Sequence, residues 1–194
     1  MARCTGRLPY SWIGRDKLIN TLARNTHRHN VAAGWWDEFD NKLDRYETAM
    51  MLCVSEIAEA MEGFRKDLMD DHLPEYKMFD VELADAMIRL LDLAGAYGVH
   101  LEDDLANKYP VALRWHREAP LRKRTVPEQL YEVVRVMTGA SPLNVIERSV
   151  NVVRAIADIN DVDLWKLVEL KHEYNKTRAD HKITARNAVG GKKF

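Results

Sequence analysis

The sequence has few of the features that mark secreted or membrane proteins. It contains two cysteines, Cys4 and Cys53, which are too few for a disulfide framework and are compatible with a reducing compartment. The opening stretch, MARCTGRLPYSWIG, lacks the apolar run of a signal peptide, and no later run is suited to spanning a bilayer. We therefore expect a cytoplasmic protein with no membrane partner.

An excess of one charge is also missing, and strand-like alternation is scarce. The 194 residues carry 29 Lys and Arg against 30 Asp and Glu, a formal net charge of −1, so nucleic acid is not an expected partner. Hydrophobic residues make up 46% and charged residues 30% of the chain, which is typical of a soluble globular protein. The length suffices for one or two small domains with a genuine core.

What the chain has in quantity is apolar residues at helical spacing. Two stripes in the first half follow the intervals i, i+4, i+7 and i+11, namely Met50, Val54, Ile57 and Met61, then Leu83, Met87, Leu90 and Ala94. We expect Gly63 to end the first of these helices, and Gly95 with Gly98 to end the second. A further helix is predicted over residues 15–33, and a short one over residues 101–108.

The second half of the chain repeats this pattern. The first stripe and its glycine correspond to Val126, Leu130, Val133, Met137 and Gly139. The second stripe corresponds, at its own constant interval, to Ile146, Val150, Val153 and Ala157. We interpret the match as an internal duplication of a unit made of two long helices and a short one.

The duplication predicts the architecture. Helix pairs with apolar inner faces must bury those faces against each other, so we expect an all-α helical bundle of two repeated units, a pseudo-dimer folded from one chain. Residues 1–110 would hold an N-terminal segment and the first unit, and residues 111–127 a connector with prolines and a basic run. Residues 128–194 would hold the second unit and a polar tail, all within one compact body.

Paired carboxylates occur on both long helices of the first unit. Glu56 and Glu59 lie three residues apart, as do Glu82 and Asp85. One interpretation is that these are solvated helix faces, with Asp85 paired to Arg89 one turn later. The other is that four carboxylates from neighbouring antiparallel helices converge on a hard divalent cation such as Mg²⁺, which prefers oxygen ligands.

The second unit favours the metal interpretation, because it keeps the core stripe and loses the acids. The residues that correspond to Glu56, Glu59, Glu82 and Asp85 are Glu132, Arg135, Val145 and Arg148. Carboxylates needed for folding would survive with the apolar stripe. The acids of the first unit are therefore predicted to serve function.

Three segments together resemble a known family. SEIAEA followed by ELADAMIRLLDLAG resembles the paired ExxE and ExxD signature of the MazG-like, all-α nucleoside triphosphate pyrophosphohydrolases. NVAAGWWDEF is similar to the segment before the first acidic helix, and KHEYNKTRADHK resembles the K-x-x-x-N-x-x-R closing motif. The resemblance implies cleavage of a nucleoside triphosphate between its α and β phosphates, with Mg²⁺ as cofactor and Mn²⁺ able to substitute.

The chain departs from the family pattern in where the closing motif lies. In the first unit that place is taken by YPVALRWHR, where Lys108 is retained but Ala112 and Trp115 stand at the positions matching Asn175 and Arg178. The closing motif follows only the second unit. We therefore expect one complete acidic site per chain, closed by the tail of its own or a partner's second half, in a monomer or a homo-oligomer such as a dimer.

The resemblance also implies roles for individual residues. The metal ligands would be Glu56, Glu59, Glu82 and Asp85, with Glu56 or Glu59 also orienting the attacking water. The phosphate oxygens would be held by Lys171, Asn175 and Arg178, which share one helix face, and more weakly by Arg65 and Lys66, expected in the loop after the first acidic helix.

Base recognition is expected in the N-terminal segment. Asn30 offers a donor and an acceptor, and Trp35 and Trp36 offer flat apolar faces, although tandem tryptophans also serve as core anchors. His27 and His29 belong either to the helix surface or to the rim of the pocket. The base and sugar stay open, as do two alternatives: a dUTPase- or dCTPase-like hydrolase of one pyrimidine nucleotide, and a non-enzymatic helical scaffold.

Overall fold

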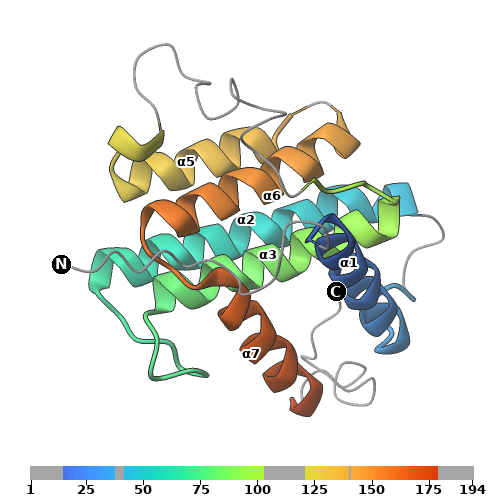
Figure 1. The fold of residues 1–194 in the computed structure, drawn as a ribbon, viewed down its shortest axis with the longest axis horizontal. Coiled ribbons are helices and arrows are strands. Elements are labelled where there is room, and N and C mark those ends of the chain that lie inside the picture. Colours follow the sequence, from blue (N-terminus) through green and yellow to red (C-terminus); the bar gives the residue numbers. More distant parts are fainter. Residues whose placement is uncertain (1–14, 38–41, 103–120, 140, 179–194) are drawn as a thin grey trace.

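The computed structural model describes residues 15–37, 42–102, 121–139 and 141–178, and these ranges are mainly helical (Figure 1). The helices are α1 (Arg15–Ala32), α2 (Lys42–Lys66), α3 (Met78–Tyr97), the 3-10 helix η2 (Leu121–Lys123), α5 (Val126–Met137), α6 (Pro142–Ile159) and α7 (Leu164–Thr177). Within these ranges the single β-type contact is an isolated bridge between Met69 and Lys77. The prediction of an all-α bundle is confirmed.

Helix α3 forms the centre of the bundle. It packs against α1, α2, α6 and α7, and Figure 1 shows α1 and α7 crossing the α2–α3 pair steeply. Because it is covered on most sides, α3 is apolar around nearly its whole circumference. Its fully buried side chains include Val81, Leu83, Met87, Leu90 and Leu91. Two carboxylates carried by this helix, Glu82 and Asp92, are therefore held inside the molecule.

Gly63 does not end α2, as the sequence suggested, because the helix continues to Lys66. The glycine marks a close approach of two helices instead. A Cβ atom built at Gly63 would lie 2.8 Å from the Cβ of Met78 and 2.9 Å from the backbone nitrogen of Phe79. The end of α2 is therefore pressed against the start of α3, and the chain turns only at Asp67, with φ of 53°.

Two glycines were expected to end α3, and one of them does. Gly98 caps the helix in the left-handed conformation, with φ of 63°, which glycine adopts without steric penalty. Gly95 lies inside α3, where a Cβ would collide with the backbone carbonyl of Ala23 and the side chain of His27. Gly95 therefore allows α1 to pack closely on α3.

The second half supplies three helices in the predicted order. A capping box of Thr125 and Glu128 starts α5, so the last two residues of the predicted connector, 126 and 127, are already helical. Helix α5 packs on α2 and α6, and α6 packs on α3. Residues 101 and 102 are not helical, and the rest of the predicted short helix, like the tail after Arg178, lies outside the described residues. The duplication itself stays a prediction.

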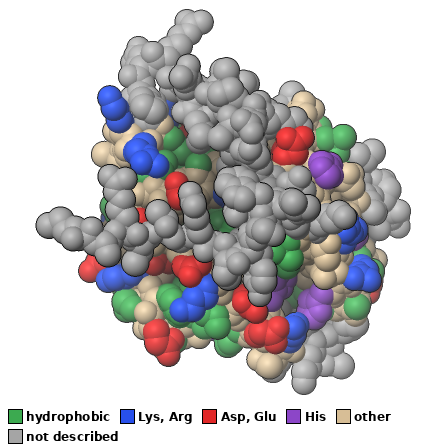
Figure 2. Space-filling model, viewed as in Figure 1, with side chains coloured by type: hydrophobic (Ala, Val, Ile, Leu, Met, Phe, Trp, Pro, Cys, Tyr) green, Lys and Arg blue, Asp and Glu red, His purple; other side chains and the backbone are tan. Residues whose placement is uncertain are grey.

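The described surface is of mixed charge. Figure 2 shows acidic and basic side chains interspersed on the visible face. Among the helices that the structure describes, none combines the length and the apolar character needed to cross a membrane.

Candidate active site

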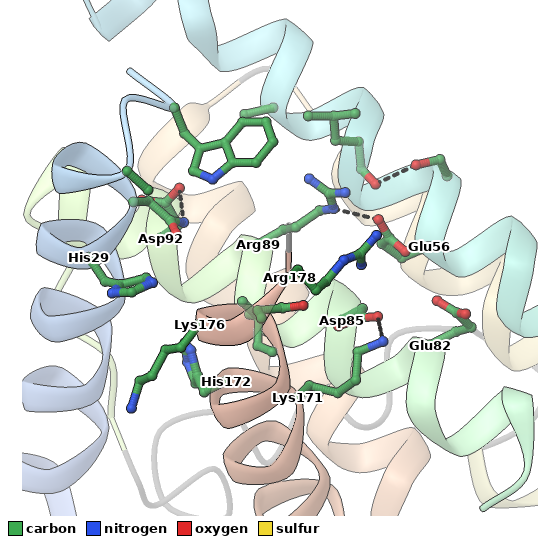
Figure 3. A pocket seen from close by; sticks show the side chains of 18 of the residues that line it. His29, Glu56, Glu82, Asp85, Arg89, Asp92, Lys171, His172, Lys176 and Arg178 are labelled. Carbon is green, nitrogen blue, oxygen red and sulfur yellow. Dashed lines mark hydrogen bonds and ion pairs between the residues drawn. The ribbon is translucent and has the colours of Figure 1, made fainter. Parts of the chain in front are cut away.

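A cavity of about 990 Å³ opens between α1, α2, α3 and α7 (Figure 3). It gathers residues that the sequence assigned to one site although they lie far apart along the chain. Those lining it are Glu56, Glu59, Glu82, Asp85, Lys171, Asn175, Arg178, Asn30 and Trp35. The α7 helix that supplies the closing motif belongs to the same chain as the acids.

Three carboxylates converge on one side of this cavity. Glu56 and Glu59 on α2 and Glu82 on α3 each offer an oxygen atom, and these atoms all lie within 4.8 Å of one another. Glu56 is 7% exposed and Glu82 is 6% exposed, so the solvated-face interpretation is wrong for these two residues. The three acids form a group that could hold a metal ion.

Among these acids, Glu82 has the most strongly raised pKa. Burial raises the pKa of Glu82 from 4.5 to about 9, with the nearby carboxylates of Asp85 and Glu56 adding to the effect. Without a cation the Glu82 carboxyl therefore keeps its proton at neutral pH, because burial and like charges both disfavour ionisation. A divalent cation placed among these oxygens would remove that penalty.

Asp85 is set apart from the other three acids. Its Oδ2 lies 2.7 Å from the Nζ of Lys171, and Lys171 is itself buried, with 2% exposure. Burial raises the pKa of Asp85 to about 6, and the Lys171 ammonium opposes the rise. The structure thus gives Asp85 an ion pair with α7, and its predicted role as a metal ligand is not matched by the three-acid group.

Arg89 pairs with a different acid from the one expected. The sequence suggested Asp85 one turn earlier, whereas the Arg89 Nε donates a hydrogen bond of 2.5 Å to the Oε1 of Glu56 on the neighbouring helix. Arg89 also lines the cavity, and sequence reasoning did not include it in the site. The signal that could have found it is its position one turn after Asp85, on the same face of α3.

Helix α7 forms the cationic wall opposite the acids. Figure 3 shows Lys171, Arg178 and Lys176 projecting from α7 and its C-terminal end around the cavity. Lys171 and Asn175 lie one turn apart on α7, whereas Arg178 follows the end of that helix with an extended backbone, so the predicted shared helix face holds for the first two residues, and all three line the cavity. The Arg178 guanidinium lies 5.7 Å from the ring centre of Tyr174. His172, one position after Lys171, joins α7 to α1 through a 3.1 Å contact with Thr26.

Arg65 and Lys66 are not in the loop where they were expected, and they do not line the cavity. Both belong to the last turn of α2, because Gly63 does not stop that helix. Both form ion pairs with Glu62 on the exposed face, and the Arg65 Nη2 lies 2.6 Å from the Glu62 Oε2. Their predicted role in holding phosphate is not supported by this placement.

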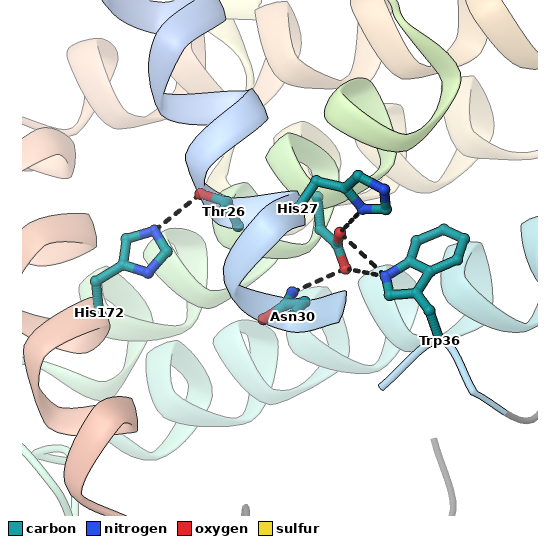
Figure 4. A network of polar contacts seen from close by, with 6 residues as sticks. Thr26, His27, Asn30, Trp36 and His172 are labelled. Carbon is teal, nitrogen blue, oxygen red and sulfur yellow. Dashed lines mark hydrogen bonds and ion pairs between the residues drawn. The ribbon is translucent and has the colours of Figure 1, made fainter. Parts of the chain in front are cut away.

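A second buried carboxylate organises the opposite end of the site (Figure 4). Asp92, 7% exposed, accepts hydrogen bonds from His27 Nδ1 at 2.8 Å and Asn30 Nδ2 at 2.8 Å. The Trp36 Nε1 lies 3.2 Å from both of its oxygens. Sequence reasoning missed this network, and the signal was an acid inside the apolar stretch LLDLAG.

The network separates the roles of the two tryptophans. The Trp36 ring packs edge-on against His27, with 4.8 Å between ring centres, and the Arg45 guanidinium lies 4.6 Å from its ring centre. Trp36 is therefore an anchor, the alternative that the sequence left open, and it does not line the cavity. Trp35 does line it, together with Asn30 and His29.

The corresponding positions of the second half hold an ion-pair cluster. The Glu132 carboxylate accepts hydrogen bonds from Arg135, which stands where the first half has Glu59, and from Arg124 Nη1 at 3.3 Å. An acid pair is thus replaced by an acid and two arginines, which leaves no excess negative charge to attract a cation.

The cavity therefore combines the acids of α2 and α3, of which Glu56 is paired with Arg89, with the basic residues of α7 and its C-terminal end. This arrangement suits a ligand that carries both a divalent cation and several anionic oxygens. Comparison of the chain with protein-family models, with curated proteins and with solved structures found no match.

Proposed function

We propose that the protein is a Mg²⁺-dependent nucleoside triphosphate pyrophosphohydrolase, which converts a nucleoside triphosphate and water into a monophosphate and pyrophosphate. The observation that carries the proposal is the convergence of Glu56, Glu59 and Glu82 in a cavity whose other side presents Lys171 and Arg178. The resemblance of the acidic and closing motifs to MazG-like enzymes points to the same reaction.

The donor set fits a hard divalent cation. It offers carboxylate oxygens alone, which suit Mg²⁺, with Mn²⁺ as a substitute, better than metals that prefer nitrogen or sulfur. A bound cation would neutralise phosphate charge and lower the pKa of a water molecule. The raised pKa of Glu82 supports a cation here, because a buried acid group of this kind is unfavourable without one.

The cationic residues of α7 would hold the phosphate chain. Arg178 can grip two phosphate oxygens at once, and Lys171 contributes a compact positive charge. The Asp85 carboxylate holds the Lys171 ammonium in position. The pair thus keeps a buried charge satisfied until phosphate oxygens arrive.

The two acids of α2 differ in their exposure to water. Glu56 is buried and pairs with Arg89, whereas Glu59 is the exposed member of the three-acid group. We assign Glu59 as the base that takes the proton of the attacking water. The water oxygen then bonds to the α phosphorus, the bond from that phosphorus to the α–β bridging oxygen breaks, and pyrophosphate leaves.

The test is a panel of common nucleoside and deoxynucleoside triphosphates with Mg²⁺, scored for pyrophosphate and orthophosphate. The proposal predicts pyrophosphate and the monophosphate, while release of orthophosphate alone would exclude α–β cleavage. A scaffold protein would release neither. The panel also decides whether one pyrimidine nucleotide is the sole substrate.

A pair of matched variants ties the activity to the site. Glu59→Gln should lower kcat at least about a hundredfold, because removing a general base typically has this effect. Glu62→Gln, one turn later on α2, removes an acid that pairs with Arg65 and Lys66 outside the cavity, and should leave kcat unchanged. Equal activity of the two variants would remove Glu59 from the mechanism.

A further inference from the structure

The loop between α2 and α3, residues 67–77, contributes His72 to the lining of the cavity. The backbone at this point is fixed by Asp70, which is 4% exposed. The Asp70 Oδ1 accepts hydrogen bonds from the backbone nitrogens of His72 at 2.9 Å and Leu73 at 2.7 Å. The Asp70 backbone nitrogen donates a hydrogen bond of 3.0 Å to the Tyr76 carbonyl oxygen. The imidazole is therefore carried on a loop of defined shape.

The His72 side chain lies with two basic side chains around the ring of Tyr174 on α7. The His72 ring centre lies 4.9 Å from the Tyr174 ring centre. The Lys171 Nζ lies 5.9 Å from the same ring centre, and the Arg178 Cζ lies 5.7 Å from it. His72, Lys171 and Arg178 line the cavity, whereas Tyr174 does not. The tyrosine ring thus brings a histidine from one element beside two cations from another.

The charges near His72 link its protonation to the binding of an anion. Partial burial lowers the pKa of His72 below its ordinary value of 6.5, and the charges of Lys171 and Arg178 lower it further. Asp70 and Asp71, on the same loop as His72, oppose this shift. An anion placed among the three basic groups would favour the imidazolium, because an opposite charge raises the pKa of an imidazole. Binding of an anion here is therefore accompanied by uptake of a proton.

His72 belongs to the end of the cavity opposite the predicted base site. Its loop leads into α3, where Glu82 lies about one turn from the start of the helix. Asp92, which holds Asn30, lies about three turns further along α3. A nucleotide whose base lies beside Asn30 and whose phosphates reach the acids therefore directs its outer phosphates toward His72.

We infer that His72 is a third phosphate-binding residue, which in its protonated form contacts the β and γ phosphates together with Lys171 and Arg178. The inference rests on the proposed function and adds a residue from the α2–α3 loop to that site. The β and γ phosphates form the pyrophosphate that the reaction releases, so His72 holds the leaving group. An imidazolium donates from both ring nitrogens, and its charge strengthens hydrogen bonds to phosphate oxygens.

The experiment measures the binding of inorganic pyrophosphate to the full-length protein with Mg²⁺, by isothermal titration calorimetry at pH 6 and pH 8. His72→Gln keeps a polar side chain but cannot carry a charge, and it should weaken binding at pH 6 about tenfold. The weakening should be smaller at pH 8, because the unaltered protein loses the imidazolium as pH rises through the pKa of His72 in the complex. His100→Gln is the control, because His100 is exposed and does not line the cavity, and it should leave binding unchanged.

The outcomes separate the phosphate contact from the hydrolysis. Equal affinity of His72→Gln and the unaltered protein at pH 6 would overturn the inference, and the proposed hydrolysis would stand. A weakening of the same size at both pH values would also overturn it, because the charge of the imidazole would then play no part. Failure of the unaltered protein to bind pyrophosphate would overturn it as well. Binding that depends on His72, in a protein that hydrolyses no nucleotide, would support the phosphate contact and overturn the proposed function.

Discussion

Glu82 and Asp92 are both buried carboxylates of α3, and their neighbours give them different roles. Glu82 faces the acids of α2, and burial with these charges raises its pKa to about 9. Asp92 accepts hydrogen bonds from His27, Asn30 and Trp36. A buried carboxylate whose oxygens accept hydrogen bonds stabilises the fold. A buried carboxylate that is surrounded by other carboxylates is stabilised by binding a cation.

The stability of the metal-free protein should therefore depend on Glu82 and pH. The folded-state pKa of about 9 lies above the ordinary value of 4.5, so the stability that Glu82 contributes is fully present below about pH 4.5 and is lost as pH rises toward 9. Glu82→Gln cannot ionise and avoids this loss. The difference in free energy of unfolding between Glu82→Gln and the unaltered protein should therefore be larger at pH 8 than at pH 5, in favour of the variant, by more than about 1 kcal/mol.

Urea unfolding in the presence of a chelator, at both pH values, measures this difference. Glu62→Gln is the control, because Glu62 is half-buried, lies outside the three-acid group and is paired with Arg65 and Lys66. The prediction fails if the two proteins differ in free energy of unfolding by the same amount at pH 5 and at pH 8. Glu82 would then ionise normally in the folded state.

At the scale of elements, the pairing of α2 with α3 depends on a glycine. Gly63→Ala would place a Cβ 2.9 Å from the backbone nitrogen of Phe79, and backbone cannot move aside as easily as a flexible side chain. Overpacking of this kind costs about 1–3 kcal/mol, which exceeds the gain of just under 1 kcal/mol from the helix propensity of alanine. We expect a net destabilisation of about 1–2 kcal/mol by chemical denaturation. A neutral or stabilising effect would show that α2 and α3 are not in close contact at this point.

The helices themselves could be predicted because apolar periodicity is a local signal. The stripes of Met50 to Met61 and of Leu83 to Ala94 fall within α2 and α3. Two glycines were misread as helix ends because their role is set by a neighbouring helix. Gly63 accommodates Met78, and Gly95 accommodates α1, and neither contact can be read from spacing along the chain.

The site was predicted to the extent that its residues share a helix face. The acids of α2 and α3 and the closing motif of α7 line one cavity because helical spacing fixes which side chains project together. The pairing of Arg89 with Glu56 and of Lys171 with Asp85 depends on how separate helices are rotated and spaced. Sequence spacing carries no information on that rotation, so the individual partners were missed.

At the scale of the whole molecule, both halves contribute charged residues to one cavity. The first half brings the acids on α2 and α3 together with Arg45 and Arg89, and the second half brings Lys171, Lys176 and Arg178 from α7 and its C-terminal end. Helices α5 and α6 cover the α2–α3 pair, and α5 carries an ion-pair cluster where the first half has its acids. The second half thus supports and completes a site built by the first, while the duplication and any assembly of chains stay predictions.

The most direct test of the central claim is anomalous diffraction from crystals grown with Mn²⁺ and a nucleotide analogue whose α–β bridging oxygen is replaced by a methylene group. The account predicts a manganese peak at bonding distance from carboxylate oxygens of Glu56, Glu59 and Glu82. The phosphates of the analogue should extend toward Lys171 and Arg178. A bound nucleotide with no manganese among these three acids, or manganese held by other residues, would contradict the account.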